Sequence, residues 1–225
     1  MKRTIHTIAA IGLLAVPATA SAADHELSLE LGSTGYAAAE HWALFNDNGY
    51  DTLPTFGLRA GFAVHDRVAV IAGWHHGRTG TRLELSGEDY YDESYYYDYD
   101  GDDYATMGMA YYANELTLGA KADWPVTVWF HPYATISGVG LLSKIRLDDD
   151  TGEDDNLNQL TRTAFAPGAQ ATGGVEFRIP ISHNTWALAS HVELGYQYAI
   201  PSSYDELGSL ANRGLVFKWG LGARF

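Results

Sequence analysis

The last eleven residues of the chain alternate strictly between two kinds of side chain. Apolar residues occupy every second position, ending on a terminal aromatic: Leu215, Phe217, Trp219, Leu221, Ala223 and Phe225. The residues between them are mostly small or charged: Val216, Lys218, Gly220, Gly222 and Arg224. A period of two is that of a β-strand whose faces meet different media. Large residues on one face, with glycines and cations on the other, favour lipid outside and a polar lumen. An edge strand of a soluble sandwich is the alternative.

Seven further segments carry the same alternation, so the sequence predicts eight strands. The other seven lie within residues 26–35, 56–64, 68–74, 116–122, 129–142, 169–179 and 186–200. Three connections are tight turns and four are longer, at 36–53, 86–111, 143–163 and 201–213. Short and long connections alternate, which predicts an all-β, antiparallel up-and-down transmembrane barrel with long extracellular loops and periplasmic termini. Ten strands stay open as an alternative, because Trp42–Leu44 hints at another pair.

The N-terminus has the features of a cleaved export signal. Lys2 and Arg3 precede the apolar run from Ile8 to Val16, and small residues follow at Ala20–Ala22. The run is far below the ~20 residues of a membrane-spanning helix. We therefore expect a signal peptide over residues 1–22 and a barrel over residues 23–225. The chain has no cysteine, which excludes disulfides, thiolate metal sites and cysteine nucleophiles.

The C-terminal strand resembles that of bacterial outer-membrane β-barrels, where a terminal phenylalanine closes the last strand. In that family such a strand forms part of the assembly signal, which here would comprise Phe217, Trp219, Leu221 and Phe225. The chain as a whole resembles small eight-stranded barrels of the OmpA/OmpX type. The resemblance implies the cell outer membrane of a Gram-negative bacterium, with outer-membrane lipid and the outer-membrane assembly machinery as partners. Roles implied are adhesion, surface protection and passage of small solutes.

Nine charged residues fall on the predicted lumen face. They are Glu30, Arg59, Glu115, Lys121, Glu176, Arg178, Glu193, Lys218 and Arg224. Five are cations and four are anions, and buried charges are tolerated when they are paired. Because an eight-stranded barrel has room for little besides side chains, we expect an ion-pair network that fills the lumen. A gated polar channel through the same residues is the alternative.

The predicted loops carry most of the negative charge of this chain, whose formal net charge is −14. Residues 88–104 contain seven Tyr, six Asp, two Glu and no cation. Three interpretations stay open: a solvated acidic surface, a tyrosine-rich recognition surface for a basic or surface protein partner, and a cation site. Asp98, Asp100 and Asp102 could give weak Ca²⁺ binding, although the spacing of an EF-hand loop is absent. Nucleic acid is disfavoured as a partner, because phosphate binding needs Lys and Arg.

These patterns predict a non-enzymatic surface protein that displays loops for binding, adhesion or surface protection, and no cofactor beyond weak Ca²⁺. A narrow, porin-like channel is the alternative from a different class. Catalysis is disfavoured. His191 and Glu193 share a face of one predicted strand, and His75–His76 lies on another, but the sequence pairs no serine nucleophile with them.

Overall fold

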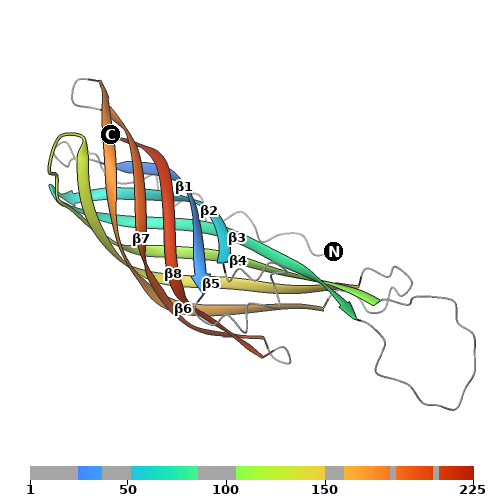
Figure 1. Cartoon of the computed structure of the whole chain (residues 1–225). Helices are drawn as coiled ribbons and strands as arrows, with labels where there is room; N and C mark the ends of the chain where they lie inside the picture. Colours follow the sequence, from blue (N-terminus) through green and yellow to red (C-terminus); the bar gives the residue numbers. More distant parts are fainter. Residues whose placement is uncertain (1–24, 37–51, 86–104, 150–159, 183–185, 205–207) are drawn as a thin grey trace, which may run out of the picture.

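The protein is an eight-stranded antiparallel β-barrel (Figure 1). The computed structural model describes residues 25–36, 52–85, 105–149, 160–182, 186–204 and 208–225. The strands are β1 (Glu26–Tyr36), β2 (Thr52–His65), β3 (Val68–Leu85), β4 (Ala105–Asp123), β5 (Phe130–Asp149), β6 (Leu160–Ser182), β7 (Trp186–Ser203) and β8 (Ser209–Arg224). No helix in these ranges is long and apolar enough to cross a membrane.

Each strand pairs with its neighbours in sequence, and the first strand pairs with the last. Glu26 lies opposite Gly61 of β2 on one side and opposite Arg224 of β8 on the other. The β1–β8 ladder continues for eleven residue pairs and makes the barrel closed. Closure satisfies the backbone of both edge strands, which lipid requires because it offers no hydrogen bonds. The predicted fold class is confirmed, and the described residues form eight strands.

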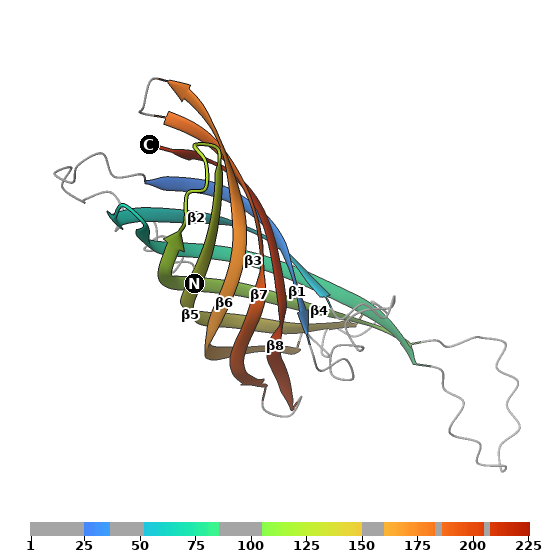
Figure 2. The same ribbon diagram turned by 60° about the vertical axis from the view of Figure 1, so that its left-hand side comes forward.

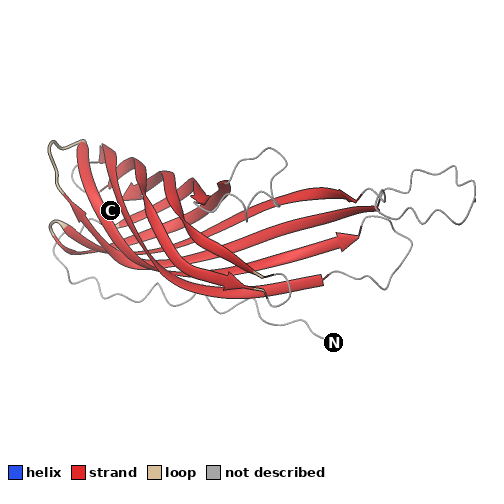
Figure 3. Ribbon diagram, turned by 60° about the horizontal axis from the view of Figure 1, so that its bottom comes forward, coloured by secondary structure: helices blue, strands red, loops and turns tan. Residues whose placement is uncertain are grey.

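The two ends of the barrel differ. One end, called here the turn end, carries both ends of the barrel chain and the connections β2–β3, β4–β5 and β6–β7. At the opposite end, the loop end, β1, β3, β5 and β7 end and β2, β4, β6 and β8 begin. Figure 2 shows β3 and β4 reaching further toward the loop end than β1 does, and Figure 3 shows that the strands are of unequal length.

The strands extend further than the alternation predicts. The β3–β4 ladder reaches Leu85 opposite Ala105, and the β5–β6 ladder reaches Leu147 opposite Leu160. The predicted connections 86–111 and 143–163 were therefore too long. The apolar alternation stops where the outer face stops being apolar, whereas backbone pairing continues beyond that point.

Every strand contributes exposed apolar side chains to a band around the outer face. Leu29, Leu118 and Ile136 are among its most exposed members, at 66%, 65% and 66%. Aromatic side chains bound the band at the turn end. Trp129 stacks on Phe177 at 6.3 Å between ring centroids, and Trp186 stacks on Phe225 at 5.0 Å. An apolar band edged by aromatic rings is the outer surface of a membrane barrel.

Candidate functional site

The lumen holds the charged side chains of the turn-end half of the barrel. All nine lumen residues expected from the sequence point inward: eight are buried, and Arg178 is partly buried. Glycines on the same face give them room. A Cβ atom on Gly220, for example, would contact the imidazole of His191. At this position a glycine therefore leaves room for a large side chain on the neighbouring strand.

Arg59 is the centre of this network. Its guanidinium contacts three carboxylates: Glu26 at 2.7 Å, Glu193 at 2.7 Å and Glu30 at 3.1 Å. The aromatic face of Tyr133 lies 5.9 Å from the same group, and its hydroxyl donates to Glu193 at 3.0 Å. One cation from β2 thus joins β1, β5 and β7 across the lumen.

A second group of charges lies nearer the turn end. Lys121 binds Glu26 at 2.9 Å and Glu176 at 2.7 Å, and Arg224 contacts the same two carboxylates. Arg178 reaches Glu176 at 2.5 Å and Asp123 at 2.8 Å. Glu26 and Asp123 were absent from the expected set, although Glu26 has the same parity as Glu30. Their positions at the strand ends, where the alternation has few repeats, concealed them.

Two histidines complete the network on the other side of Arg59. The Glu30 carboxylate lies 2.6 Å from His75 Nε2 and 2.8 Å from His191 Nε2. His75 Nδ1 is also 3.5 Å from Glu115, which Lys218 approaches at 3.5 Å. Each lumen carboxylate whose side chain the structure describes therefore has a cation or an imidazole beside it.

The loop-end half of the lumen is filled differently, by apolar and tyrosine side chains. This cluster, called here the apolar plug, consists of Tyr36, Leu53, Tyr111, Ala113, Leu141, Ile145, Ala164, Ala166, Ala199, Tyr204 and Leu210. Sequence reasoning missed it, because it treated the inner face as polar throughout. A signal was present in β5, where four of the five inward positions from 139 to 147 are apolar: Val139, Leu141, Ile145 and Leu147.

Hydroxyl groups inside the plug are hydrogen-bonded to one another. Tyr204 and Ser143 share a bond of 2.5 Å, and Asn212 donates to Ser202 at 2.7 Å. Burial raises the pKa of the Tyr204 phenol, which follows the end of β7. The phenol therefore stays neutral at ordinary pH, and the plug brings no charge into the loop-end half.

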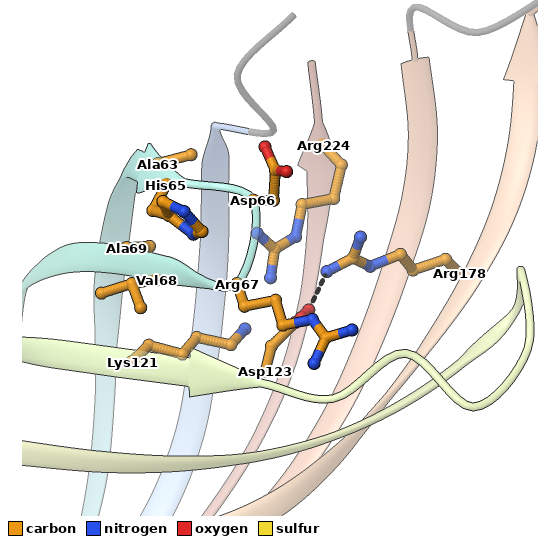
Figure 4. Close-up of a pocket in the computed structure, with 10 residues that line it drawn as sticks. All are labelled: Ala63, His65, Asp66, Arg67, Val68, Ala69, Lys121, Asp123, Arg178 and Arg224. Atoms are coloured by element: carbon orange, nitrogen blue, oxygen red, sulfur yellow. Dashed lines mark hydrogen bonds and ion pairs between the residues drawn. The ribbon is translucent and has the colours of Figure 1, made fainter.

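The turn-end mouth has a shallow pocket, shown in Figure 4. Its walls include Arg67 and Asp66 from the β2–β3 turn, with Lys121, Asp123 and Arg224 facing them. Its charged lining consists of four cations and two carboxylates: Arg67, Lys121, Arg178 and Arg224 against Asp66 and Asp123.

The residues assigned to the assembly signal lie on the outer face of β8 and at its end. Phe217, Trp219 and Leu221 are 44%, 37% and 43% exposed in the apolar band. Phe225 exchanges two backbone hydrogen bonds with His25, of 2.8 and 3.0 Å. The final residue therefore completes the β1–β8 seam at the turn end.

The acidic loop positions Asp98, Asp100 and Asp102 lie outside the described residues, as does the expected signal peptide. Within the described part of the chain, no group of three His, Asp or Glu side chains could hold a metal ion.

A barrel with charges inside and apolar side chains outside is stable only with lipid around it. The chain is a small eight-stranded membrane barrel. Its two faces were predicted correctly from the alternation, and a slip of one residue would have exchanged them.

Comparison with solved structures finds small outer-membrane barrels. The attachment invasion locus protein Ail of Yersinia pestis is 15% identical, covering 90% of this chain and 99% of that chain, with a TM-score of 0.42. Neisserial surface protein A is 10% identical over 91% and 96% of the two chains, with a TM-score of 0.40. The outer-membrane protease OmpT from Escherichia coli is 11% identical over 90% and 95%, with a TM-score of 0.41. No protein-family model matches the sequence, and no curated protein matches it.

Proposed function

We propose that this protein is an outer-membrane surface protein of a Gram-negative bacterium that holds long loops outside the cell for binding, adhesion or surface protection. The filled lumen carries this proposal. Paired charges occupy the turn-end half and the apolar plug occupies the loop-end half, with Arg59, Glu193, Tyr111 and Leu141 all at most 4% exposed. The barrel then serves as a rigid support for the long connections between its strands.

The plug disfavours the channel alternative. A conducting pore needs water along its whole length, and charged or polar rings where it is narrow. The described inner face at the loop end instead offers the packed side chains of the plug, whose tyrosines are neutral. Passage of a hydrated ion would require Tyr111 and its neighbours to leave their positions.

We expect no stepwise conductance from the purified barrel in planar lipid bilayers. Heat-modifiable migration of the same sample checks that the barrel is folded. Failed folding then cannot be mistaken for a closed lumen. Two results together would contradict the proposal and favour the channel. They are discrete conductance steps from the wild type and a changed ion selectivity of those steps in a Lys218→Gln variant.

The histidines of the lumen support a non-enzymatic role. His75 and His191 are 3% and 1% exposed, and both are bound to Glu30. A general base must come within ~3 Å of the proton that it removes from a substrate. Neither imidazole can be reached by a substrate while the plug and the ion pairs are in place, so their role is to pair Glu30.

The acidic segment 88–104 supports two further parts of the proposal, a basic partner at the cell surface and a weak Ca²⁺ site. Calorimetry should detect Ca²⁺ binding in the millimolar range that is usual for extracellular sites. The triple variant Asp98→Asn, Asp100→Asn, Asp102→Asn should lose it. Identical isotherms for the two proteins would leave this segment as a solvated acidic surface.

A further inference from the structure

The outer wall of β6 is apolar over a greater length than lipid can cover. None of its outward-facing residues from Phe165 to Ile181 is polar, and this run spans seventeen residues. About 9–11 residues of a tilted strand cross the hydrocarbon of a bilayer. On β3, at the other side of the barrel, the corresponding run from Val68 to Trp74 spans only seven residues. The apolar wall is therefore too long for the bilayer on one side of the barrel alone.

The excess lies at both ends of this side. Ile179 and Ile181 are 64% and 70% exposed, and they follow Phe177, whose ring stacks on Trp129 where aromatic side chains bound the apolar band. At the loop end, Ile200 of the neighbouring strand β7 is exposed as well. Apolar surface that extends beyond the hydrocarbon favours association of membrane proteins.

Small residues form the middle of this wall. They occupy the outer face of β5 and β6 and are interrupted by Ile136 on β5. The set, called here the β5–β6 trough, consists of Ala134, Gly138, Gly140, Pro167, Ala169, Ala171 and Gly173. Larger exposed side chains border the trough on β7. These are Leu194, Tyr196 and Tyr198, called here the β7 ridge.

Two glycines of the trough are not required by packing within the barrel. Among the described residues, and apart from chain neighbours, the atom nearest to a Cβ on Gly138 would be 3.8 Å away, and on Gly173 it would be 3.9 Å away. An inward glycine differs, because a Cβ on Gly119 would lie 2.1 Å from the backbone oxygen of Ile136. Glycine weakens a strand and marks a bulge or the close approach of another backbone. The β5–β6 ladder continues through both glycines without a shift of register, which leaves the close approach.

We propose that a second copy of this chain packs on this face, with the β7 ridge of each copy in the β5–β6 trough of the other. A ridge beside a trough is self-complementary about a twofold axis, the commonest symmetry of oligomers. Three strands ~4.8 Å apart, over about eleven residues at ~3.3 Å each, form a wall of ~500 Å² per copy. Two such walls bury ~1,000 Å², which reaches the size of a specific interface. The interface depends on the membrane insertion in the proposed function and not on what the loops bind.

Sedimentation equilibrium of the full mature barrel in density-matched detergent micelles measures this association. The wild type should show a concentration-dependent equilibrium of monomer and dimer. The double variant Gly138→Leu, Gly173→Leu should dimerise at least about tenfold more weakly, because two leucine side chains fill the trough and hold the walls apart. Its barrel should still fold, since both positions have room for a side chain, and heat-modifiable migration checks this.

The variant Ala60→Leu, Ala72→Leu is the matched control. Ala60 of β2 and Ala72 of β3 lie opposite each other and face outward on the other side of the barrel. This variant adds the same leucines to the lipid-facing wall and should dimerise as the wild type does. Equal losses in the two double variants, or no loss in either, would overturn the inference.

Cross-linking in outer membranes tests the same contact without detergent. The chain has no cysteine, so a single introduced cysteine reports on one position. With a short bifunctional maleimide, Ala171→Cys should give a product of twice the monomer mass, and Ala72→Cys should not. A product of another mass would place a different protein on this face, and the absence of any product would leave the face to lipid; either result overturns the inference. A wild type that fails to insert would overturn the proposed function instead.

Discussion

Replacing Arg59 with methionine should destabilise the folded barrel by about 3–5 kcal/mol, the usual cost of leaving a buried charge without its partner. Three buried carboxylates lose their shared cation, and Glu193 keeps only the hydroxyl groups of Tyr133 and Thr172. That change is a large fraction of the ~5–15 kcal/mol that stabilises most folded domains. Urea titration of the barrel in lipid vesicles, followed by tryptophan fluorescence, measures it.

Two companion variants separate the loss of pairing from other effects. Arg78→Met removes an exposed arginine from the outer wall and should change stability by about 0.5 kcal/mol or less. Adding Glu193→Gln to Arg59→Met should restore part of the loss, because one unpaired carboxylate is then absent. If the Arg59→Met variant has the same urea midpoint of unfolding as the wild type, the prediction is wrong. Water must then enter the lumen and solvate the freed carboxylates.

Deleting Phe225, or changing it to serine, should leave the outer membrane with much less folded protein than the wild type. Deletion removes two backbone hydrogen bonds to His25 and the ring stacked on Trp186. At about 1 kcal/mol for each bond and for the aromatic pair, the β1–β8 seam loses ~3 kcal/mol at its turn end. The β1–β8 ladder closes the barrel, so weakening its turn end exposes backbone groups of the two edge strands to lipid, which offers them no hydrogen bonds. Heat-modifiable migration of outer-membrane fractions gives the folded amount.

Phe177→Ser is the matched control for the Phe225 variants. Phe177 is 43% exposed against 44% for Phe225, and it also stacks on a tryptophan at the turn end. It lies on β6, away from the seam, so it tests the loss of an aromatic girdle residue alone. A wild-type folded yield from the Phe225 deletion would refute the role of this residue in assembly. Equal losses from Phe177→Ser and Phe225→Ser would attribute the effect to the girdle and not to the seam.

The alternation of the sequence determined the number of strands, their antiparallel order and the face on which each residue lies. The reason is that lipid and lumen differ strongly in polarity, so each residue in the band carries information about its environment. Leu215 to Phe225 is sufficient to assign both faces of the last strand. The nine charged residues point inward because a charge at the bilayer centre is unfavourable on the outer face.

Only the tertiary structure decided how far the strands extend, which charges meet and how the lumen is closed. Beyond the lipid boundary the outer face becomes polar, so the period of two fades at Arg78 and Lys144 although the ladders continue to Leu85 and Asp149. The partners of Arg59 come from β1 and β7, and no local pattern encodes a contact across a closed barrel. The apolar plug likewise depends on side chains from separate strands meeting in one layer, and closure of the sheet is what brings them together.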